Sequence, residues 1–170
     1  MEGPNRVTET IIRYQSVHLR RGQRPVLLGA TFQATQGDVV VLMGPSGSGK
    51  TTILRTIAGL EAFDRGSIAV DDVTVACGEP DMGVLGRLRS KVGMVFQFHC
   101  LFEHLTALRN VTLAPIHVHR VPAAEAERKA RRFLEALGVE HRADALPREL
   151  SGGEAQRVAI ARALDRKSVV

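Results

Sequence analysis

Residues 39–52 of the chain read Val-Val-Val-Leu-Met-Gly-Pro-Ser-Gly-Ser-Gly-Lys-Thr-Thr. The five apolar residues that open this stretch are typical of a strand buried on both faces of a parallel sheet. The next residues form the pattern Gly44-x4-Gly49-Lys50-Thr51, and residues 53–60 then show the apolar spacing of a helix. A strand, a glycine-rich loop and a helix in this order predict a phosphate-binding loop.

The residue types of this loop match the chemistry of a bound nucleotide. Glycines let successive backbone N–H groups converge on phosphate oxygens, and the following helix presents its positive end to the same anion. Lys50 would neutralise the β- and γ-phosphates, and the Thr51 hydroxyl would bind Mg²⁺. The motif predicts a P-loop NTPase without specifying which kind. The predicted nucleotide-binding residues of the loop are Gly44, Pro45, Ser46, Gly47, Ser48, Gly49, Lys50, Thr51 and Thr52.

The sequence Leu-Ser-Gly-Gly-Glu at 150–154, continued by AQRVAIARAL, is the second informative motif. Ser151 and Glu154 have the spacing of a capping box, so a helix is expected to begin here. A serine hydroxyl, two glycines and a helix start also make a candidate anion site. In a P-loop protein this segment resembles the signature motif of the ATP-binding cassette (ABC) ATPases, which usually carry Gln at the position of Glu154.

The resemblance to ABC ATPases extends over nearly the whole chain. Val95-Phe96-Gln97 resembles the Q-loop, and residues 101–147 resemble the helical subdomain, in particular that of polar amino acid importers. The resemblance implies an α/β fold with a RecA-like P-loop NTPase core. The implied parts are the core with a small antiparallel β subdomain over 1–97, an α-helical subdomain over 98–150 and the signature helix over 151–164.

The resemblance also implies a mechanism. Two ATPase subunits would form a head-to-tail dimer, with each ATP and its Mg²⁺ held between the loop of one subunit and the signature motif of the other. Gln97 would approach the Mg²⁺ and the attacking water. ATP binding and hydrolysis would drive two transmembrane permease subunits from the cytoplasmic face of the plasma membrane, and an external solute-binding protein would supply the solute. The residues implied to face the other subunit's ATP are Ser151, Gly152, Gly153 and Glu154.

Two features depart from the family's pattern. Arg21, beside Gly22, stands where the family carries an aromatic residue that stacks on adenine; a guanidinium can also stack on a base, and the alternative is a solvated loop residue. The strand that carries the catalytic Asp-Glu pair (Walker B) and the later histidine have no counterpart, so no catalytic residue is nominated. We expect a chain truncated at about Leu164, with an incomplete sheet and a non-native tail over 165–170.

Apolar periodicity predicts the remaining elements. Residues 122–137 have helical spacing, and their apolar stripe is expected to pack in a core. That stripe consists of Ala126, Ala130, Phe133, Leu134 and Leu137. The expected strands cover residues 7–20 and 26–35, a hairpin at 68–70 and 73–75, and a short apolar run at 91–96.

Composition narrows the function further. The chain has 170 residues, of which 44% are hydrophobic and 24% charged. Its longest apolar run is far shorter than the ~20 residues of a membrane-spanning helix. The net charge of +5 is spread along the chain and aromatic residues make up 4%, so no nucleic-acid partner is expected. The main prediction is an importer ATPase; the alternatives are a soluble ABC ATPase acting on DNA or ribosomes, and a nucleotide-binding fragment without turnover.

Overall fold

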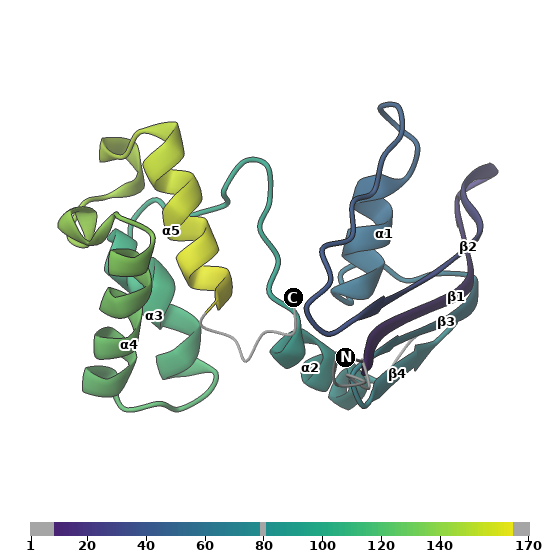
Figure 1. Cartoon of the computed structure of the whole chain (residues 1–170), viewed down its shortest axis with the longest axis horizontal. Helices are drawn as coiled ribbons and strands as arrows, with labels where there is room; N and C mark the ends of the chain where they lie inside the picture. Colours follow the sequence, from purple (N-terminus) through teal and green to yellow (C-terminus); the bar gives the residue numbers. More distant parts are fainter. Residues whose placement is uncertain (1–8, 79–80, 165–170) are drawn as a thin grey trace, which may run out of the picture. The chain divides into compact units, whose positions relative to one another are not determined.

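The computed structural model describes residues 9–78 and 81–164. The predicted non-native tail, residues 165–170, lies outside these described residues. The chain divides into two compact units, of which the first reaches Val92 and the second begins at Gly93. In Figure 1 the strands with α1 and α2 belong to the first unit, and α3, α4 and α5 belong to the second.

The first unit contains an antiparallel sheet with the strand order β2-β1-β3-β4 (Figure 1). This order follows from two hairpins, because β1 pairs with β2 and β3 pairs with β4, while β1 and β3 join the hairpins. The predicted N-terminal strands and the predicted short hairpin are therefore confirmed. The strands are β1 (Thr10–Arg21), β2 (Arg24–Thr35), β3 (Arg65–Val70) and β4 (Val73–Ala76).

Gly66 allows β1 and β3 to approach each other at an irregular point of the ladder. The register between these strands shifts between Gln15 and His18, and Ser16 there has a φ of 46°. Gly66 has a φ of +99°, and a Cβ at this position would lie 2.5 Å from the carbonyl oxygens of Gln15 and Ser16. A side chain at residue 66 would therefore collide with backbone atoms that have no room to move.

Helix α1 (Lys50–Ile57) is bonded to the sheet through the side chain of Tyr14. The Tyr14 ring on β1 stacks on Phe32 of β2 at 4.9 Å between centroids, and the hydroxyl lies 2.9 Å from Thr56 Oγ1 near the end of α1. Helix α2 (Met82–Lys91) is capped by Asp81, which accepts hydrogen bonds from two backbone N–H groups. The buried core of this unit includes Tyr14, Val17, Leu19, Leu27, Ile57, Phe63, Ile68, Val70, Val73, Val75 and Leu88.

The predicted strands at 39–43 and 91–96 are not formed. Val39 is 91% exposed and Met43 is 88% exposed, so the apolar run after β2 is not buried. A parallel strand needs hydrogen-bonding neighbours, and among the residues that the structure describes no strand pairs with either run. Lys91 instead ends α2, and the segment after it approaches α5: a Cβ on Gly93 would lie 2.6 Å from the Ala163 carbonyl oxygen.

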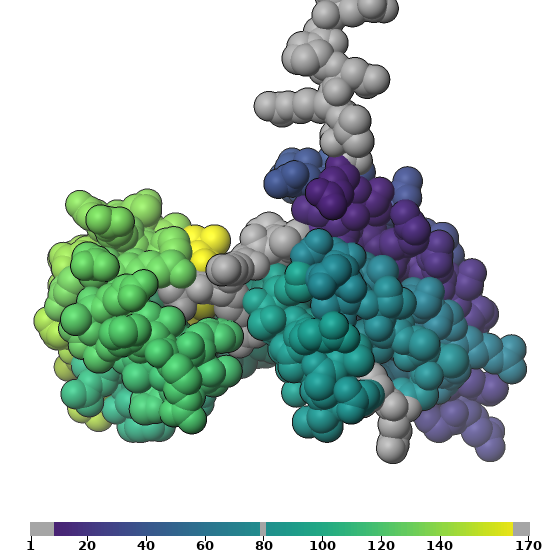
Figure 2. Space-filling model, turned by 90° about the horizontal axis from the view of Figure 1, so that it is seen from below, coloured from purple at the N-terminus to yellow at the C-terminus, as the bar shows by residue number. Residues whose placement is uncertain are grey.

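The second unit is a bundle of helices, and Figure 2 shows its surface in colours from teal-green to yellow. The predicted helix at 122–137 is confirmed as α4 (Ala123–Ala136), with Ala126, Ala130 and Leu134 buried and its other stripe residues, Phe133 and Leu137, half-buried. The remaining elements are α3 (Ala107–His117), α5 (Gly152–Leu164) and the short 3₁₀ helices η1 (Glu140–Arg142) and η2 (Pro147–Glu149). The core includes Ala107, Leu108, Val111, Ala130, Leu134, Val139, Ala143, Val158 and Ala161.

A buried amide fixes the loop that leads into α3. Asn110 Oδ1 accepts a hydrogen bond from the Phe102 N–H at 2.8 Å, and Nδ2 donates to the carbonyl oxygens of Phe102, Leu105 and Thr106. Asn110 is 1% exposed, and its buried amide thus joins α3 to four backbone groups between Phe102 and Thr106. This loop is held by one side chain rather than by regular secondary structure.

Because the Tyr14 hydroxyl is buried, we expect the chain to lose stability when the phenol ionises at high pH. Burial raises the pKa of Tyr14, and the hydrogen bond with Thr56 opposes that shift by a smaller amount. The folded state thus favours the neutral phenol. The stability that this phenol contributes is complete below the ordinary pKa near 10 and is lost as the pH rises through the raised pKa of the folded state.

We expect Tyr14→Phe to lower the free energy of unfolding by about 1 kcal/mol at pH 7 and to make it fall less steeply above pH ~10. Denaturant titrations at both pH values measure this. Tyr14 is the single tyrosine of the chain, so phenolate absorbance reports on it directly. An ordinary pKa for the folded chain would contradict the prediction.

Candidate nucleotide-binding site

Glycines shape the predicted phosphate-binding loop and bring it against the sheet. Gly47 and Gly49 have φ values of +81° and +92°, in the left-handed region that side chains disfavour. A Cβ at Gly49 would lie 2.9 Å from Leu27 Cδ2 and 3.1 Å from the Val26 carbonyl oxygen, both on β2. Gly49 is also the residue before α1, so the helix starts where the loop touches the sheet.

The ammonium group of Lys50 folds back over the loop. Nζ donates hydrogen bonds to the carbonyl oxygens of Gly44 and Pro45, both at 2.7 Å, and lies 3.4 Å from Ser48 Oγ. These acceptors are neutral, and a phosphate oxygen is a stronger acceptor for an ammonium ion. A bound phosphate would therefore compete with these carbonyl oxygens for the Lys50 ammonium group.

The first turn of α1 has the features of an anion site. Gly49 has no side chain to cap the helix, so the N–H groups of the first turn have no side-chain cap. Thr51 lies exposed in this turn, whereas Thr52 is buried. The Thr51 hydroxyl suits Mg²⁺, which binds few protein oxygens and takes its other ligands from phosphate and water.

Arg21 is anchored to this helix. Its Nη2 and Nε donate to Glu61 Oε1 at 2.6 and 3.1 Å, and Nη2 lies 3.4 Å from Thr52 Oγ1. Glu61 Oε2 also lies 3.3 Å from Arg55 Nε on α1. Arg21 is therefore not a freely solvated loop residue, although its side chain is 59% exposed.

Gln97 lies exposed in a turn of the second unit. The residues that follow this turn are tied to α5, because Arg162 donates to the carbonyl oxygens of Cys100 and His99 at 2.7 and 2.9 Å. Sequence reasoning missed Arg162, which is half-buried on α5 and belongs to no motif that would predict its partners. These two hydrogen bonds hold the segment just after Gln97 against the signature helix.

The capping box predicted for the signature motif is confirmed. The Ser151 N–H donates to Glu154 Oε2 at 2.7 Å, and the Glu154 N–H donates to Ser151 Oγ at 3.3 Å. Glu154 Oε1 also faces Arg142 Nε at 3.4 Å and His141 Nε2 at 3.7 Å. The Ser151 N–H above all, then the Ser151 hydroxyl and the charges of Arg142 and His141, hold the pKa of Glu154 below its ordinary value near 4.5.

The structure brings some of the predicted site residues together and leaves others apart. Residues 44–52 and Arg21 lie together in the first unit, whereas Gln97 and residues 151–154 belong to the second. An association of Gln97 or the signature motif with the phosphate loop stays a prediction. Within residues 9–78 and 81–164, no three His, Cys, Asp or Glu side chains are grouped to hold a metal ion.

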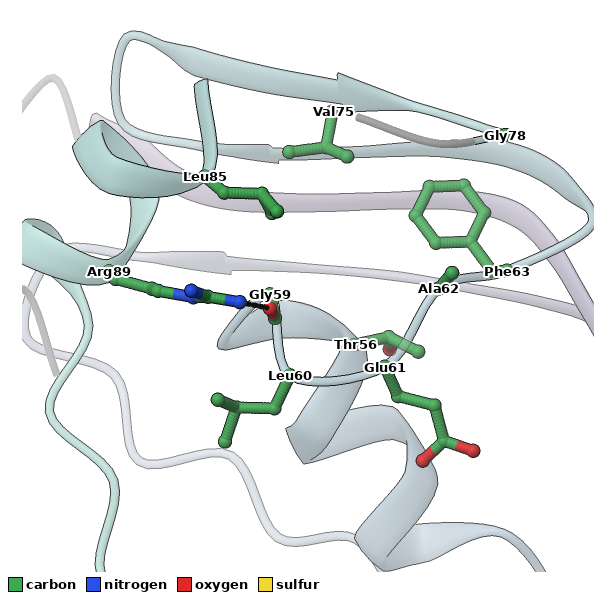
Figure 3. Close-up of a pocket in the computed structure, with 10 residues that line it drawn as sticks. All are labelled: Thr56, Gly59, Leu60, Glu61, Ala62, Phe63, Val75, Gly78, Leu85 and Arg89. Atoms are coloured by element: carbon green, nitrogen blue, oxygen red, sulfur yellow. Dashed lines mark hydrogen bonds between the residues drawn. The ribbon is translucent and has the colours of Figure 1, made fainter. Parts of the chain in front are cut away.

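Sequence reasoning also missed a pocket of ≈ 200 Å³ lined by the end of α1, the segment after it, β4 and α2, which contains none of the predicted site residues (Figure 3). Arg89 reaches across to the Gly59 carbonyl oxygen at 2.8 Å at one side of the pocket (Figure 3). The lining residues are Thr56, Gly59, Leu60, Glu61, Ala62, Phe63, Val75, Gly78, Leu85 and Arg89.

The pattern that defines the ABC transporter family matches residues 16–170. The chain therefore belongs to the ABC transporter family, and the resemblance inferred from the two motifs is confirmed.

Two curated relatives are transport ATP-binding proteins. The chain is 45% identical over 157 residues to the glutamine transport ATP-binding protein GlnQ of Geobacillus stearothermophilus, with 92% of this chain and 64% of the relative covered. It is 44% identical over 154 residues to the glutamate/aspartate import ATP-binding protein GltL of Escherichia coli (strain K12), with 91% and 63% covered. The chain thus spans less than two thirds of the length of these relatives.

Solved structures confirm the α/β P-loop NTPase fold class. The dimeric structure of MJ0796, a bacterial ABC transporter cassette, matches with a TM-score of 0.82 and 34% identity over 93% of this chain and 71% of that one. A dimeric post-hydrolysis state of the same cassette, bound to ADP and Pi, matches with a TM-score of 0.81, the same identity and the same coverage. In the described parts of this chain, every helix is too short or too polar to cross a membrane.

The charge of Glu154 predicts an acid-sensitive start of α5. The stability that the ionised Glu154 carboxylate contributes is present above its ordinary pKa. It is lost as the pH falls through the lower pKa of the folded state, because protonation removes the charge that accepts the Ser151 N–H. In Glu154→Gln the side-chain carbonyl still accepts this bond and does not titrate. We expect the variant to lose less stability than the unsubstituted chain between pH 6 and pH 3 in denaturant titrations. Equal losses in the two proteins would contradict this expectation.

Proposed function

We propose that this chain is the nucleotide-binding part of an ATPase that drives the import of a polar amino acid. The observation that carries the proposal is the pair of motifs built on helix starts, the phosphate loop before α1 and Ser-Gly-Gly at the start of α5. Relatives named for glutamine and for glutamate/aspartate transport support a polar amino acid as the solute. No observation on this chain favours a soluble ATPase acting on DNA or ribosomes.

The roles proposed for the residues follow from chemistry. The backbone N–H groups of residues 44–52 and the Lys50 ammonium would bind the triphosphate. The Thr51 hydroxyl would hold Mg²⁺, and the family resemblance implies that Gln97 approaches the same ion. When bound, Mg²⁺ neutralises charge on the β- and γ-phosphates. The proposed domain boundaries remain those inferred from the sequence: core and β subdomain over 1–97, helical subdomain over 98–150 and signature helix over 151–164.

The two signature glycines support a role outside the subunit's own fold. Apart from the adjacent residues and the backbone of α5 itself, no described heavy atom lies within 4 Å of a Cβ built on Gly152, and a Cβ on Gly153 would meet only Arg157 Nη1 at 3.5 Å. Neither glycine has a positive φ, and glycine weakens a helix relative to alanine. We infer that these positions are glycine because the γ-phosphate of a nucleotide on a second subunit approaches the backbone there.

We propose the assembly that the family resemblance implies, and the open backbone at Gly152 and Gly153 supports its dimer. Two ATPase subunits bind two ATP molecules head to tail at the cytoplasmic face of the plasma membrane, where they act on two transmembrane permease subunits. Closure on ATP and reopening after hydrolysis would alternate the access of the permease. An external solute-binding protein would deliver the amino acid.

For these 170 residues taken alone, we propose nucleotide binding without turnover. The family resemblance implies a catalytic Asp-Glu pair, and none of these 170 residues is an Asp followed by a Glu. Phosphate release measured beside ATP binding tests this proposal, with turnover at the buffer background expected. Turnover that scales with protein concentration would contradict it.

Nucleotide binding predicts a specific effect of Lys50→Ala. A hydrogen bond to a charged group contributes about 1.5–3 kcal/mol, so we expect ATP affinity to fall by about 10- to 150-fold. Equilibrium titration with a fluorescent ATP analogue measures it. Lys129→Ala removes the same charge from α4 in the second unit and serves as the control. Equal affinities in the two variants would contradict the assignment of Lys50.

The proposed dimer predicts that Gly152→Asp binds ATP but does not dimerise. An added carboxylate would keep a second subunit's nucleotide away by size and charge, while the open space at Gly152 lets the subunit fold. Light scattering with and without ATP measures dimerisation. Gly86→Asp is the matched control, because Gly86 is also a helical glycine with no described heavy atom within 4 Å of its added Cβ. ATP-driven dimerisation of Gly152→Asp would contradict the proposal.

A further inference from the structure

The pocket beside the end of α1 lies entirely within the first unit. All of its lining residues fall between Thr56 and Arg89, and none belongs to the phosphate loop (Figure 3). Its volume of ≈ 200 Å³ exceeds the ~150 Å³ in which an apolar protein cavity holds a benzene molecule. The pocket therefore has room for a ring or a branched hydrocarbon group together with one small polar group.

The floor of the pocket is apolar and buried. Figure 3 shows the side chains of Phe63, Val75 and Leu85 around the same space. Phe63 and Val75 are each 5% exposed, and Thr56 is 2% exposed. The Thr56 hydroxyl is already hydrogen-bonded to the Tyr14 hydroxyl at 2.9 Å. The floor thus offers hydrocarbon surface to a ligand, and its one hydroxyl is already used by the fold.

The rim of the pocket is open to solvent, and its backbone donors are already used. The N–H groups of Gly59, Leu60 and Gly78 donate to carbonyl oxygens of the chain itself at 3.1, 2.8 and 3.4 Å. Leu60 is 42% exposed, and Ala62 and Gly78 are also exposed. A ligand can therefore enter without any opening of the fold, and the polar contact it makes must come from a side chain.

Arg89 provides that polar contact. Its Nη2 donates to the Gly59 carbonyl oxygen at 2.8 Å at one side of the pocket, and a carboxylate is a stronger acceptor for a guanidinium than a carbonyl is. The other charged lining residue is Glu61, whose carboxylate points away from the apolar side chains in Figure 3. This carboxylate faces Arg21 at 2.6 Å and Arg55 at 3.3 Å, so its negative charge is already compensated.

We propose that this pocket binds a small hydrophobic carboxylate, with its hydrocarbon group against Phe63, Val75 and Leu85 and its carboxylate on Arg89. A neutral ligand of the same shape gains only the apolar contacts. A zwitterionic amino acid must also bury its ammonium group, and the carboxylate of Glu61 is already paired. The site shares no residue with the phosphate loop, so this inference does not rest on the proposed nucleotide-binding function.

Amide chemical-shift titrations of the full 170-residue chain with three probes test the proposal. Phenylacetate, phenylacetamide and phenylalanine share a benzyl group and differ in charge. We expect phenylacetate to bind with a dissociation constant on the order of 1 mM. It should bind about 10-fold more tightly than the other two probes, because the hydrogen bond to Arg89 is charge-assisted. The shifted amides should lie within residues 56–63, 75–78 and 85–89.

Arg89→Met separates the role of the charge from a structural role. We expect this variant to bind phenylacetate about 10-fold more weakly and phenylacetamide unchanged. Arg87→Met is the matched control, because Arg87 is an exposed arginine on α2 that does not line the pocket. Its affinity for phenylacetate should equal that of the unsubstituted chain. If Arg89→Met weakens both probes equally, Arg89 acts only on the fold, and its assignment to the carboxylate is wrong.

Leu85→Trp tests the position of the site by filling the pocket. We expect it to abolish the binding of phenylacetate and phenylacetamide alike, and thermal unfolding checks that each variant folds. A folded Leu85→Trp that binds phenylacetate as the unsubstituted chain does would overturn the site, as would shifts confined to residues outside the lining.

The remaining outcomes concern the class of ligand. If phenylacetamide binds as tightly as phenylacetate, the pocket selects no charge, and the carboxylate proposal fails. If phenylalanine binds at least as tightly as phenylacetate, the pocket takes a zwitterion, and the proposal fails. A chain that binds phenylacetate but not ATP would contradict the proposed function and support this inference.

Discussion

The attachment of α1 to the antiparallel sheet is the constraint on which the first unit depends. Near its end the helix is bonded through Thr56 to the fully buried hydroxyl of Tyr14, where exclusion of water strengthens the hydrogen bond. At its start, Gly49 brings the backbone against β2 more closely than a side chain would allow. The ion pair between Arg21 and Glu61 joins the tip of the first hairpin to the segment just after the helix. These contacts give the loop before α1 a defined place, even though the loop itself has no regular secondary structure.

In the second unit, side chains satisfy the free backbone groups at the start of α5. The backbone groups there are satisfied by the reciprocal bonds of Ser151 and Glu154, so the two glycines between them contribute nothing that the helix itself requires. Arg142 faces the Glu154 carboxylate from η1, and Arg162 holds the loop after Gln97. Side chains thus provide the local stability of this region, and the glycine backbone at 152 and 153 stays accessible to a ligand.

Sequence patterns predicted the elements whose hydrogen bonds are local. The helix at 122–137 and the hairpin at 68–75 appear as expected, because their backbone partners lie a few residues away. The strands predicted at 39–43 and 91–96 are not formed. A strand needs hydrogen bonds to a second strand, and the sequence of the run does not say whether such a strand lies beside it. Within the candidate site, spacing predicted the phosphate loop and the capping box but not the partners of their charged residues. Glu61 and Arg142 have no periodicity or motif to reveal them.

The sequence alone therefore decided the chemistry: glycines, Lys50 and Thr51 at fixed spacing for phosphate, and Ser-Gly-Gly-Glu for a capped helix start. Both are local patterns in which neighbouring residues already supply the needed groups. Tertiary structure alone decided what surrounds them. Arg21 and Glu61 are 40 residues apart in the chain and Tyr14 and Thr56 are 42 apart, so only the folding of the sheet against α1 brings them within hydrogen-bond distance. A pairing over such a separation depends on the path of the whole intervening chain, which no local pattern records.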